Sequence, residues 1–214
     1  MEKHRDKISY FRDKIKHKNQ IERKLLNISI NGMEKMFSDM NAIEVFRGNV
    51  ISYYYDVPLD FVARFFGIDS DKIRLGSSGG FLRLREMFDD DSTELYFAET
   101  RIKNIQISIF GADYLEYGRM FDHEGFEYLK AIHDSALHLR ETEKKKRIIL
   151  IIPNSRGLEY CLDTIYEPFN VEPYMEVEAD SMEKYLSGIS LINKTHDDFV
   201  DISARRLIEQ KRNK

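Results

Sequence analysis

The sequence predicts an α/β fold in which helices cover a mixed sheet, with a helical N-terminal extension and a C-terminal helix. Three observations lead to this prediction. Strand-like and helix-like segments alternate in the second half of the chain, which is typical of a sheet with some parallel strands. Hydrophobic residues make up 42% and charged residues 33% of the 214 residues, which indicates a globular protein with a real core. A charged amphipathic segment stands at each end of the chain.

We expect three parts: a charged helical extension over 1–40, a small α+β segment over 41–92 and an α/β domain over 93–214. In the extension, apolar residues recur near helical spacing over 2–25, and a second helical stretch covers 33–40. Both helices are expected to dock on the body of the protein or on a second copy of the chain.

The middle part combines one strand with short helices. A strand is predicted over 45–57, because this stretch is rich in β-branched and aromatic residues and Pro58 ends it. Apolar spacing predicts a helix over 59–66, which Gly67 ends. A further short amphipathic helical stretch is expected over 81–88.

The last part alternates strands with helices, as a layered α/β domain does. The predicted strands are 95–102, 105–110, 147–152 and 174–177. The predicted helices are 125–143, 157–166, 181–189 and 197–211.

The net charge of −4 is unevenly spread along the chain. Residues 1–25 carry nine Lys/Arg and four Asp/Glu, and residues 204–214 carry five Lys/Arg and one Glu, so two basic ends flank an acidic body. Basic ends could contact nucleic acid or an acidic partner, and they could equally be the solvated faces of terminal helices.

Cysteine count and hydropathy exclude two classes of protein. The single cysteine, Cys161, excludes an internal disulfide and a zinc site of several cysteines. The longest apolar run, 148–153, is too short for a membrane helix, and the N-terminus lacks the apolar core of a signal peptide. A cytoplasmic protein without a membrane partner is therefore predicted.

Residues 59–74 have the spacing of a helix-turn-helix. Ala63 is small where two helices approach, Gly67 follows at the turn, and Ile73 would anchor the second helix. The side chains predicted to contact DNA are Arg64, Ser70, Lys72 and Arg74. A plain structural turn explains the same residues, and the nearby Asp69 and Asp71 would repel phosphates.

A glycine-rich loop offers a candidate phosphate site. Its backbone amides could cradle a phosphate at the start of a helix, and two arginines follow. The predicted phosphate-binding residues are Gly76, Ser77, Ser78, Gly79, Arg83 and Arg85. The Lys-Ser/Thr pair of a P-loop is absent, so a flexible linker between domains is the alternative.

The order of segments in the carboxyl half matches a known family. A strand over 105–110 precedes the segment 121–126 and a helix, the next strand is 147–153, and 180–186 gives a final helix. Over about 104–190 the chain resembles a STAS domain, the fold shared by anti-sigma-factor antagonists and sulfate-transporter tails. In that family an Asp-Ser-Ser-Gly loop caps the central helix, and its second serine is phosphorylated to switch partner binding.

The resemblance assigns this loop to four residues, which are the predicted partner-binding site: Asp122, His123, Glu124 and Gly125. Glu124 stands where the family has the switching serine. The resemblance therefore implies a fixed negative charge at the helix N-terminus, where such a charge is favourable.

No set of side chains in the sequence indicates catalysis, a cofactor or a metal site. The histidines and carboxylates over 122–138 lack the spacing of a metal motif. We therefore expect a non-catalytic regulatory protein that acts through protein contacts, with a protein partner, DNA or a second copy of the chain. Two alternatives stay open: a DNA-binding transcriptional regulator using 59–74, and a phosphate- or nucleotide-ligand protein, including an enzyme, using 76–85.

Overall fold

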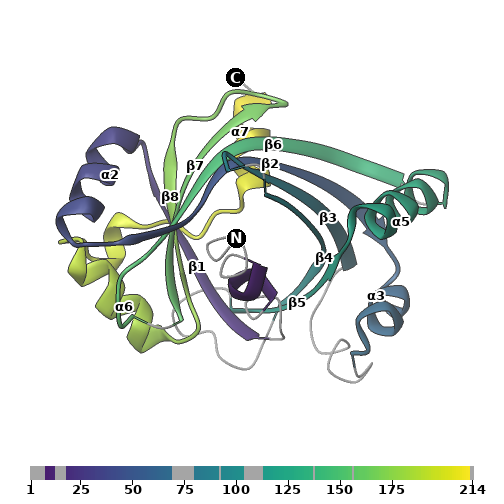
Figure 1. The fold of residues 1–214 in the computed structure, drawn as a ribbon, viewed down its shortest axis with the longest axis horizontal. Coiled ribbons are helices and arrows are strands. Elements are labelled where there is room, and N and C mark those ends of the chain that lie inside the picture. The colour runs from purple at the N-terminus through teal and green to yellow at the C-terminus, as the bar shows by residue number, and fades with distance from the viewer. Residues whose placement is uncertain are drawn as a thin grey trace. The chain divides into compact units, whose positions relative to one another are not determined.

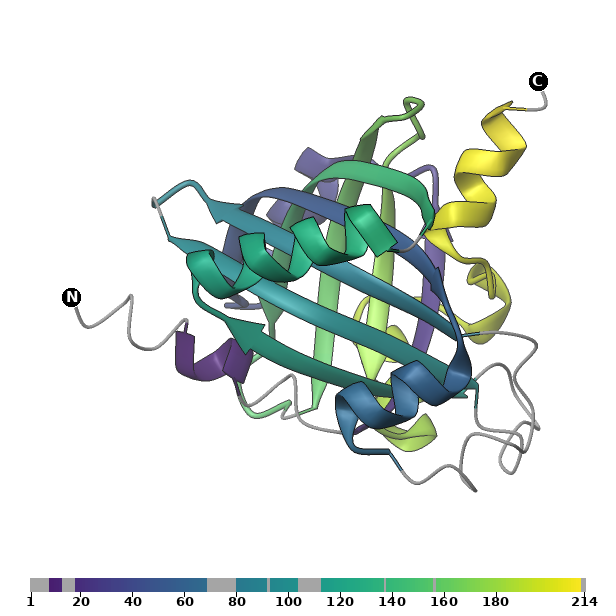
Figure 2. The same ribbon diagram turned by 90° about the vertical axis from the view of Figure 1, so that its right-hand side faces the viewer.

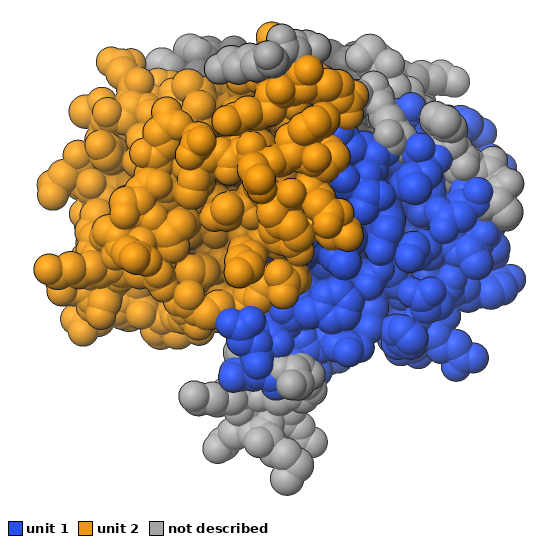
Figure 3. Space-filling view, turned by 90° about the horizontal axis from the view of Figure 1, so that it is seen from above, with its two compact units in different colours: residues 1–19, 50–143 blue, residues 20–49, 144–214 orange. Residues whose placement is uncertain are grey.

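The computed structural model describes residues 8–12, 18–68, 80–91, 93–103, 113–136, 138–155 and 157–212. The chain divides into two compact units, coloured in Figure 3. Unit 1 consists of Met1–Asn19 and Val50–Glu143, and unit 2 consists of Gln20–Asn49 and Lys144–Lys214. Two long strands, β2 (Ile43–Val57) and β6 (His138–Ile151), belong in part to each unit.

The fold is mainly antiparallel sheet, so the predicted α/β fold with a mixed sheet covered by helices is wrong. Eight strands lie in the described part of the chain, and the strand pairs resolved there with a register all run antiparallel. In the described part of the chain, helices are fewer than strands (Figure 1). The prediction from the sequence was wrong because several strands carry charged residues at every second position. We had interpreted these charged residues as the exposed faces of helices.

Unit 1 is built on the strands β3 (Gly80–Asp89), β4 (Glu94–Lys103) and β5 (Asp113–Phe121). Strand β4 lies between the other two, and β2 lies beside β3. Two helices belong to this unit, α3 (Leu59–Phe66) and α5 (His123–Ala136). Figure 2 shows α5 lying across one face of this sheet.

The helix-covered face of the unit 1 sheet is apolar. Its buried side chains include Tyr55 of β2, Leu84 of β3 and Ala98 of β4, packed with Val62 of α3 and Phe126 of α5. Since successive residues of a strand point to opposite faces, the residues between them lie on the other face of the sheet. Several of those intervening residues are charged and are described with the candidate site.

Unit 2 is built on the strands β1 (Lys18–Leu26), β8 (Tyr174–Ala179), β7 (Leu158–Glu167) and the second half of β6. Strand β8 pairs with β1 on one side and with β7 on the other, and β7 pairs with β6. The helical elements of this unit are α2 (Ile30–Asp39), α6 (Met182–Leu191), η1 (His196–Asp198) and α7 (Ala204–Arg212).

Helices α2 and α6 cover one face of the unit 2 sheet (Figure 1). Phe37 of α2 and Tyr185 of α6 are fully buried in a cluster with apolar side chains of all four strands. Helix α6 approaches β7 closely at Gly188, where a Cβ atom would lie 2.7 Å from the Leu158 side chain. The Tyr160 hydroxyl donates a hydrogen bond to the Gly188 carbonyl at 2.9 Å. A side chain at this position would therefore have to displace Leu158.

Several predicted elements are confirmed by the structure. Helix α2 begins three residues before the expected 33–40 and ends one residue before its end. Strand β2 contains the expected 45–57, and α3 has the expected 59–66. Strands β4 and β8 and helix α6 also match, and α7 covers the second half of the expected 197–211. The expected strand over 105–110 lies outside the described residues.

Four predicted helices are wrong in whole or in part. Residues 18–25 of the expected N-terminal helix belong to β1, and the expected helix 157–166 is β7. The stretch 81–88 belongs to β3. The expected helix 125–143 ends at Ala136, and β6 begins at His138.

Among the described residues, no helix is long and apolar enough to cross a membrane.

Candidate functional site

The sheet of unit 2 buries charged side chains on the face opposite its apolar core. Ten side chains from four strands make up this surface, which we call the charged face, and each is at least nine-tenths buried. Its members are Gln20, Glu22, Lys24, Lys145, Arg147, Glu159, Cys161, Asp163, Glu176 and Glu178. The strands hold them there because side chains at every second position of a strand point to the same face, while apolar residues between them pack under α2 and α6.

The strand registers place three glutamates in one row. Glu22 of β1 is the direct partner of Glu178 of β8, which is the direct partner of Glu159 of β7. Like charges that lie directly opposite each other across strands destabilise a sheet. A buried row of this kind therefore favours the binding of a cation.

In the next row, Lys24 of β1 lies opposite Glu176 of β8 and joins the two strands. Lys24 Nζ forms ion pairs with Glu22 Oε1 and, at 2.8 Å, with Glu176 Oε1. Burial by itself would lower the pKa of Lys24, but Glu176 and Glu22 beside it raise that pKa above its ordinary value. Lys24 is therefore a permanent positive charge between two strands.

Arg147 links the strands on the other side. Its Nε and Nη2 donate to the two oxygens of Asp163 at 2.7 and 2.6 Å, and Nη2 also lies 2.5 Å from Glu176 Oε2. Lys145 Nζ lies 2.8 Å from Asp163 Oδ2. Burial alone would raise the pKa of Glu176, but Lys24, Arg147 and Lys145 hold it well below its usual range. Glu176 is thus ionised although it is buried.

The charged face fits a divalent cation. It contains five carboxylates and three cationic side chains, which leaves a formal charge of −2 on these residues. Carboxylate oxygens of Glu22, Glu176 and Glu178 lie within 4.8 Å of one another, and oxygen ligands are those that Mg²⁺ and Mn²⁺ prefer. Gln20 adds a further observation: its Nε2 donates to Glu178 Oε2 at 2.7 Å, while its buried Oε1 accepts no hydrogen bond from the described residues.

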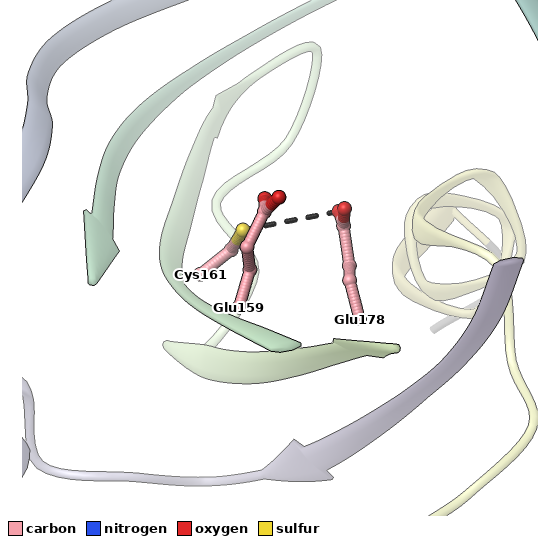
Figure 4. Close-up of side chains that lie close together, drawn as sticks. All are labelled: Glu159, Cys161 and Glu178. Carbon is pink, nitrogen blue, oxygen red and sulfur yellow. Dashed lines mark hydrogen bonds between the residues drawn. The ribbon is translucent and has the colours of Figure 1, made fainter. Parts of the chain in front are cut away.

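A second group of ligand atoms shares Glu178. Figure 4 shows the side chains of Glu159 and Cys161, both from β7, pointing toward Glu178 of β8. Their ligand atoms also lie within 4.8 Å of one another, and Cys161 Sγ is 3.8 Å from Glu178 Oε1. Both groups are buried.

Unit 1 carries a charged surface of its own, the arginine face, formed by Arg83, Arg85, Glu99, Arg101 and Glu116. Arg83 Nε donates to Glu99 Oε2 at 2.8 Å, and Arg83 Nη2 donates to Glu116 Oε1 at 3.2 Å. Three arginines against two glutamates give this face a positive excess. Guanidinium groups bind phosphate oxygens in a bidentate manner, so this face is suited to an anion.

Of the six residues predicted to bind phosphate, the structure describes two. Arg83 and Arg85 are buried on the arginine face, on strand β3 and not at the start of a helix. The loop residues, Gly76, Ser77, Ser78 and Gly79, lie outside the described residues.

The residues predicted to bind a partner lie at the start of α5. Asp122 Oδ1 accepts a hydrogen bond from the Gly125 amide at 2.8 Å, and the His123 ring lies 5.2 Å from the ring of Tyr96. Glu124 is an exposed acid in the first turn of the helix. These contacts explain why the helix begins here, and binding of a partner by these residues stays a prediction.

The predicted DNA-contacting residues lie around α3. Arg64 is exposed and forms an ion pair with Asp60 of the same helix at 3.1 Å. Ser70, Lys72 and Arg74 lie outside the described residues. Val62 and Ala63 pack into the sheet core of unit 1, so the face of α3 that we assigned to a second helix is occupied by strands.

No protein-family model and no curated protein matches this sequence. Solved structures do match. A protein from Pyrococcus horikoshii is 12% identical, with a TM-score of 0.61 over 88% of this chain and 98% of its own. A candidate adenylate cyclase from Vibrio parahaemolyticus is 13% identical, with a TM-score of 0.60 over 90% of this chain and 98% of its own.

A candidate adenylyl cyclase from Hippeastrum, described as having a dominant triphosphatase activity, is 11% identical. Its TM-score is 0.52 over 91% of this chain and 96% of its own. The chain has the fold of these proteins. Identities this low establish the fold and nothing about activity.

These likenesses overturn three of our interpretations. The resemblance to a STAS domain is wrong, because the chain shares its fold of antiparallel strands with structures that include two candidate adenylate cyclases, and not with STAS domains. The non-catalytic regulatory function drawn from that resemblance is wrong for the same reason. The helix-turn-helix interpretation and the DNA-binding function are wrong as well, since α3 packs on a sheet in a fold of this class.

The sequence analysis missed the charged face entirely. We had placed Glu22 and Lys24 on a solvated helix and Glu159 and Asp163 on another helix. One signal could have found part of the site: Glu176 alternates with apolar residues in the stretch 174–177 that we did predict as a strand, and Glu178 follows two positions later in β8. Acidic residues at every second position of a strand that is buried on both faces indicate a candidate functional site.

Proposed function

We propose that this protein binds a divalent cation together with a chain of phosphates on the charged face, and that it hydrolyses a phosphoanhydride bond there. The observation that carries the proposal is the burial of carboxylates and cations together on one face of the unit 2 sheet. Support comes from the matching structures, because adenylate cyclase and triphosphatase reactions both use a triphosphate. Of the functions left open by the sequence, the phosphate or nucleotide alternative agrees best with these neighbours.

Three carboxylates would hold the cation: Glu22, Glu176 and Glu178. A bound divalent cation neutralises charge on phosphate oxygens and generates a hydroxide nucleophile from water at neutral pH. Glu176 suits this role because its lowered pKa keeps it ionised, and a protonated carboxyl group cannot serve as an anionic ligand.

Lys24 and Arg147 would bind the phosphate oxygens. Each is buried and already oriented by Glu176, Lys24 at 2.8 Å from Oε1 and Arg147 at 2.5 Å from Oε2. Cationic groups that are fixed in advance need no reorganisation when negative charge develops on the transferred phosphoryl group. Arg147 also presents a planar fork of donors that matches a phosphate.

The test is phosphate release from inorganic triphosphate and from ATP by the full chain, with Mg²⁺ or Mn²⁺. We expect release that depends on the cation and that falls by more than about tenfold in Glu176→Gln, since the loss of even an indirect metal contact has an effect of that size. Glu183→Gln, on the exposed side of α6, is the matched control and should keep full activity. Absence of release from both substrates, or full activity of a folded Glu176→Gln protein, would refute the proposal.

A further inference from the structure

We propose that Cys161 is a metal ligand, together with Glu159 and Glu178, in a second cation position of the charged face that selects thiophilic divalent ions such as Zn²⁺ and Cd²⁺. This site goes beyond the proposed phosphate chemistry and does not depend on it. It differs from the group of Glu22, Glu176 and Glu178 in the chemistry of its donor atoms, because one of them is sulfur.

The strand pairing brings the three side chains together. Glu159 and Cys161 are two residues apart on β7 and therefore point to the same face. Glu178 is the direct cross-strand partner of Glu159. The three ligand atoms lie within 4.8 Å of one another, with Sγ of Cys161 at 3.8 Å from Glu178 Oε1, and Figure 4 shows the side chains converging.

A separate observation points to a cation at the same carboxylate. Gln20 is 2% exposed, and its Nε2 donates to Glu178 Oε2 at 2.7 Å. This donation fixes the orientation of the amide, because a carboxylate accepts hydrogen bonds and the amide oxygen cannot donate one. The Gln20 Oε1 atom is then left buried near Glu178, without a hydrogen-bond donor in the described parts of the chain. A buried carbonyl oxygen of this kind needs a partner, and a cation supplies one.

The donor set determines which ions this position takes. Sulfur is a soft ligand that favours zinc-like ions, whereas Mg²⁺ takes oxygen ligands almost exclusively. Binding proceeds by loss of the thiol proton to solvent as the bond between Sγ and the metal forms, with no change of oxidation state. An ion held by Glu159 and Glu178 would also reduce the repulsion within the row of Glu22, Glu178 and Glu159.

Cadmium titration of the full chain tests this site through the ultraviolet charge-transfer band of a cadmium thiolate. Because the chain has one cysteine, the band can come from Cys161 alone. We expect the band to saturate near about one equivalent, as a closed metal site does, and to persist in excess Mg²⁺. Cys161→Ser should abolish the band, and its thermal melt should show that the protein still folds.

Glu159→Gln separates a built site from simple binding of cadmium to a thiol. In the built site this variant keeps Cys161 and its band but needs more than about tenfold higher Cd²⁺ to reach half-saturation. Glu183→Gln, on the exposed side of α6, is the control and should titrate like the unaltered protein. Absence of a band, or a half-saturation point unchanged by Glu159→Gln, would overturn the proposal. Triphosphatase activity is not part of this readout, so failure of this site and failure of the proposed function are distinguishable.

Discussion

Arg147→Met is the substitution whose effect on stability the structure defines best. Arg147 is 3% exposed, and its two shortest ion pairs are with the buried carboxylates of Asp163 and Glu176, while a third carboxylate, that of Glu178, lies 3.8 Å away. Methionine fills similar volume without the charge, so the variant leaves negative charge in the interior with fewer cations around it. Removal of one partner from a buried ion pair costs about 3–5 kcal/mol.

The lower end of that range is the better expectation here. Lys145 still contacts Asp163 at 2.8 Å, and Lys24 still contacts Glu176 at 2.8 Å, so neither carboxylate loses all of its compensation. We therefore expect a loss of about 3 kcal/mol. For a chain of this length that corresponds to a fall of about 6–12 °C in melting temperature.

A thermal melt followed by circular dichroism measures this fall. The control is Arg64→Met, which removes an ion pair whose arginine is 77% exposed and should cost no more than about 1 kcal/mol. The double variant Arg147→Met with Asp163→Asn should recover part of the loss, because it also removes a buried charge. If Arg147→Met melted within the range of the Arg64→Met control, our account of the charged face as a tightly compensated network would be wrong.

Three further predictions concern other parts of the fold. Burial lowers the pKa of His133 from 6.5 despite the opposing effect of Asp134. As the pH falls below about 6.5, this histidine is therefore protonated in the unfolded chain before it is protonated in the folded protein, which favours unfolding. The melting temperature should fall with pH in this range, and it should fall less in His133→Gln. Tyr55→Phe removes a 2.6 Å hydrogen bond to Asp134 and should lower the free energy of urea unfolding by about 1 kcal/mol. Gly157→Ala should lower the melting temperature through a loss of about 1–3 kcal/mol, because φ is +84° and the new Cβ would lie 2.1 Å from the Asp180 carboxylate.

Each of the three has an outcome that would contradict it. Equal pH dependence in the parent and in His133→Gln would show that another group controls acid sensitivity. Unchanged unfolding of Tyr55→Phe would mean that solvent replaces the hydrogen bond to Asp134 at no cost. A Gly157→Ala protein as stable as the parent would show that the turn relaxes without strain.

Elements whose formation is decided locally could be predicted from the sequence. Helix α3 has the predicted bounds because its apolar spacing ends at Gly67, whose φ of 66° is the left-handed conformation that glycine adopts readily. Strand β2 could be predicted from its β-branched and aromatic residues up to Pro58. Helix α6 begins after Ser181, whose hydroxyl accepts a hydrogen bond from the Lys184 amide at 3.3 Å.

Strand β7 and the charged face could not be predicted in the same way. In β7, Leu158, Tyr160 and Leu162 alternate with Glu159, Cys161 and Asp163, and both sets are buried. An acid in a sequence is normally assigned to solvent, because a buried charge is costly unless it is paired. The partners of Asp163 are Lys145 and Arg147, which come from another strand, and no local pattern reveals that pairing. The charged face therefore depends on contacts between distant parts of the sequence.

The pairing of β1 with β8 has a consequence for synthesis of the chain on the ribosome. Lys24 of β1 cannot form its ion pair with Glu176 of β8 until about four-fifths of the chain has been synthesised. Contacts of such long sequence separation form late and slowly, because loop closure must come first. Until then the edge of β1 that pairs with β8 stays unpaired, and unpaired strand edges make a chain prone to aggregation, which is why chaperones are needed. Premature termination before β8 would leave Glu22 and Lys24 without Glu178 and Glu176.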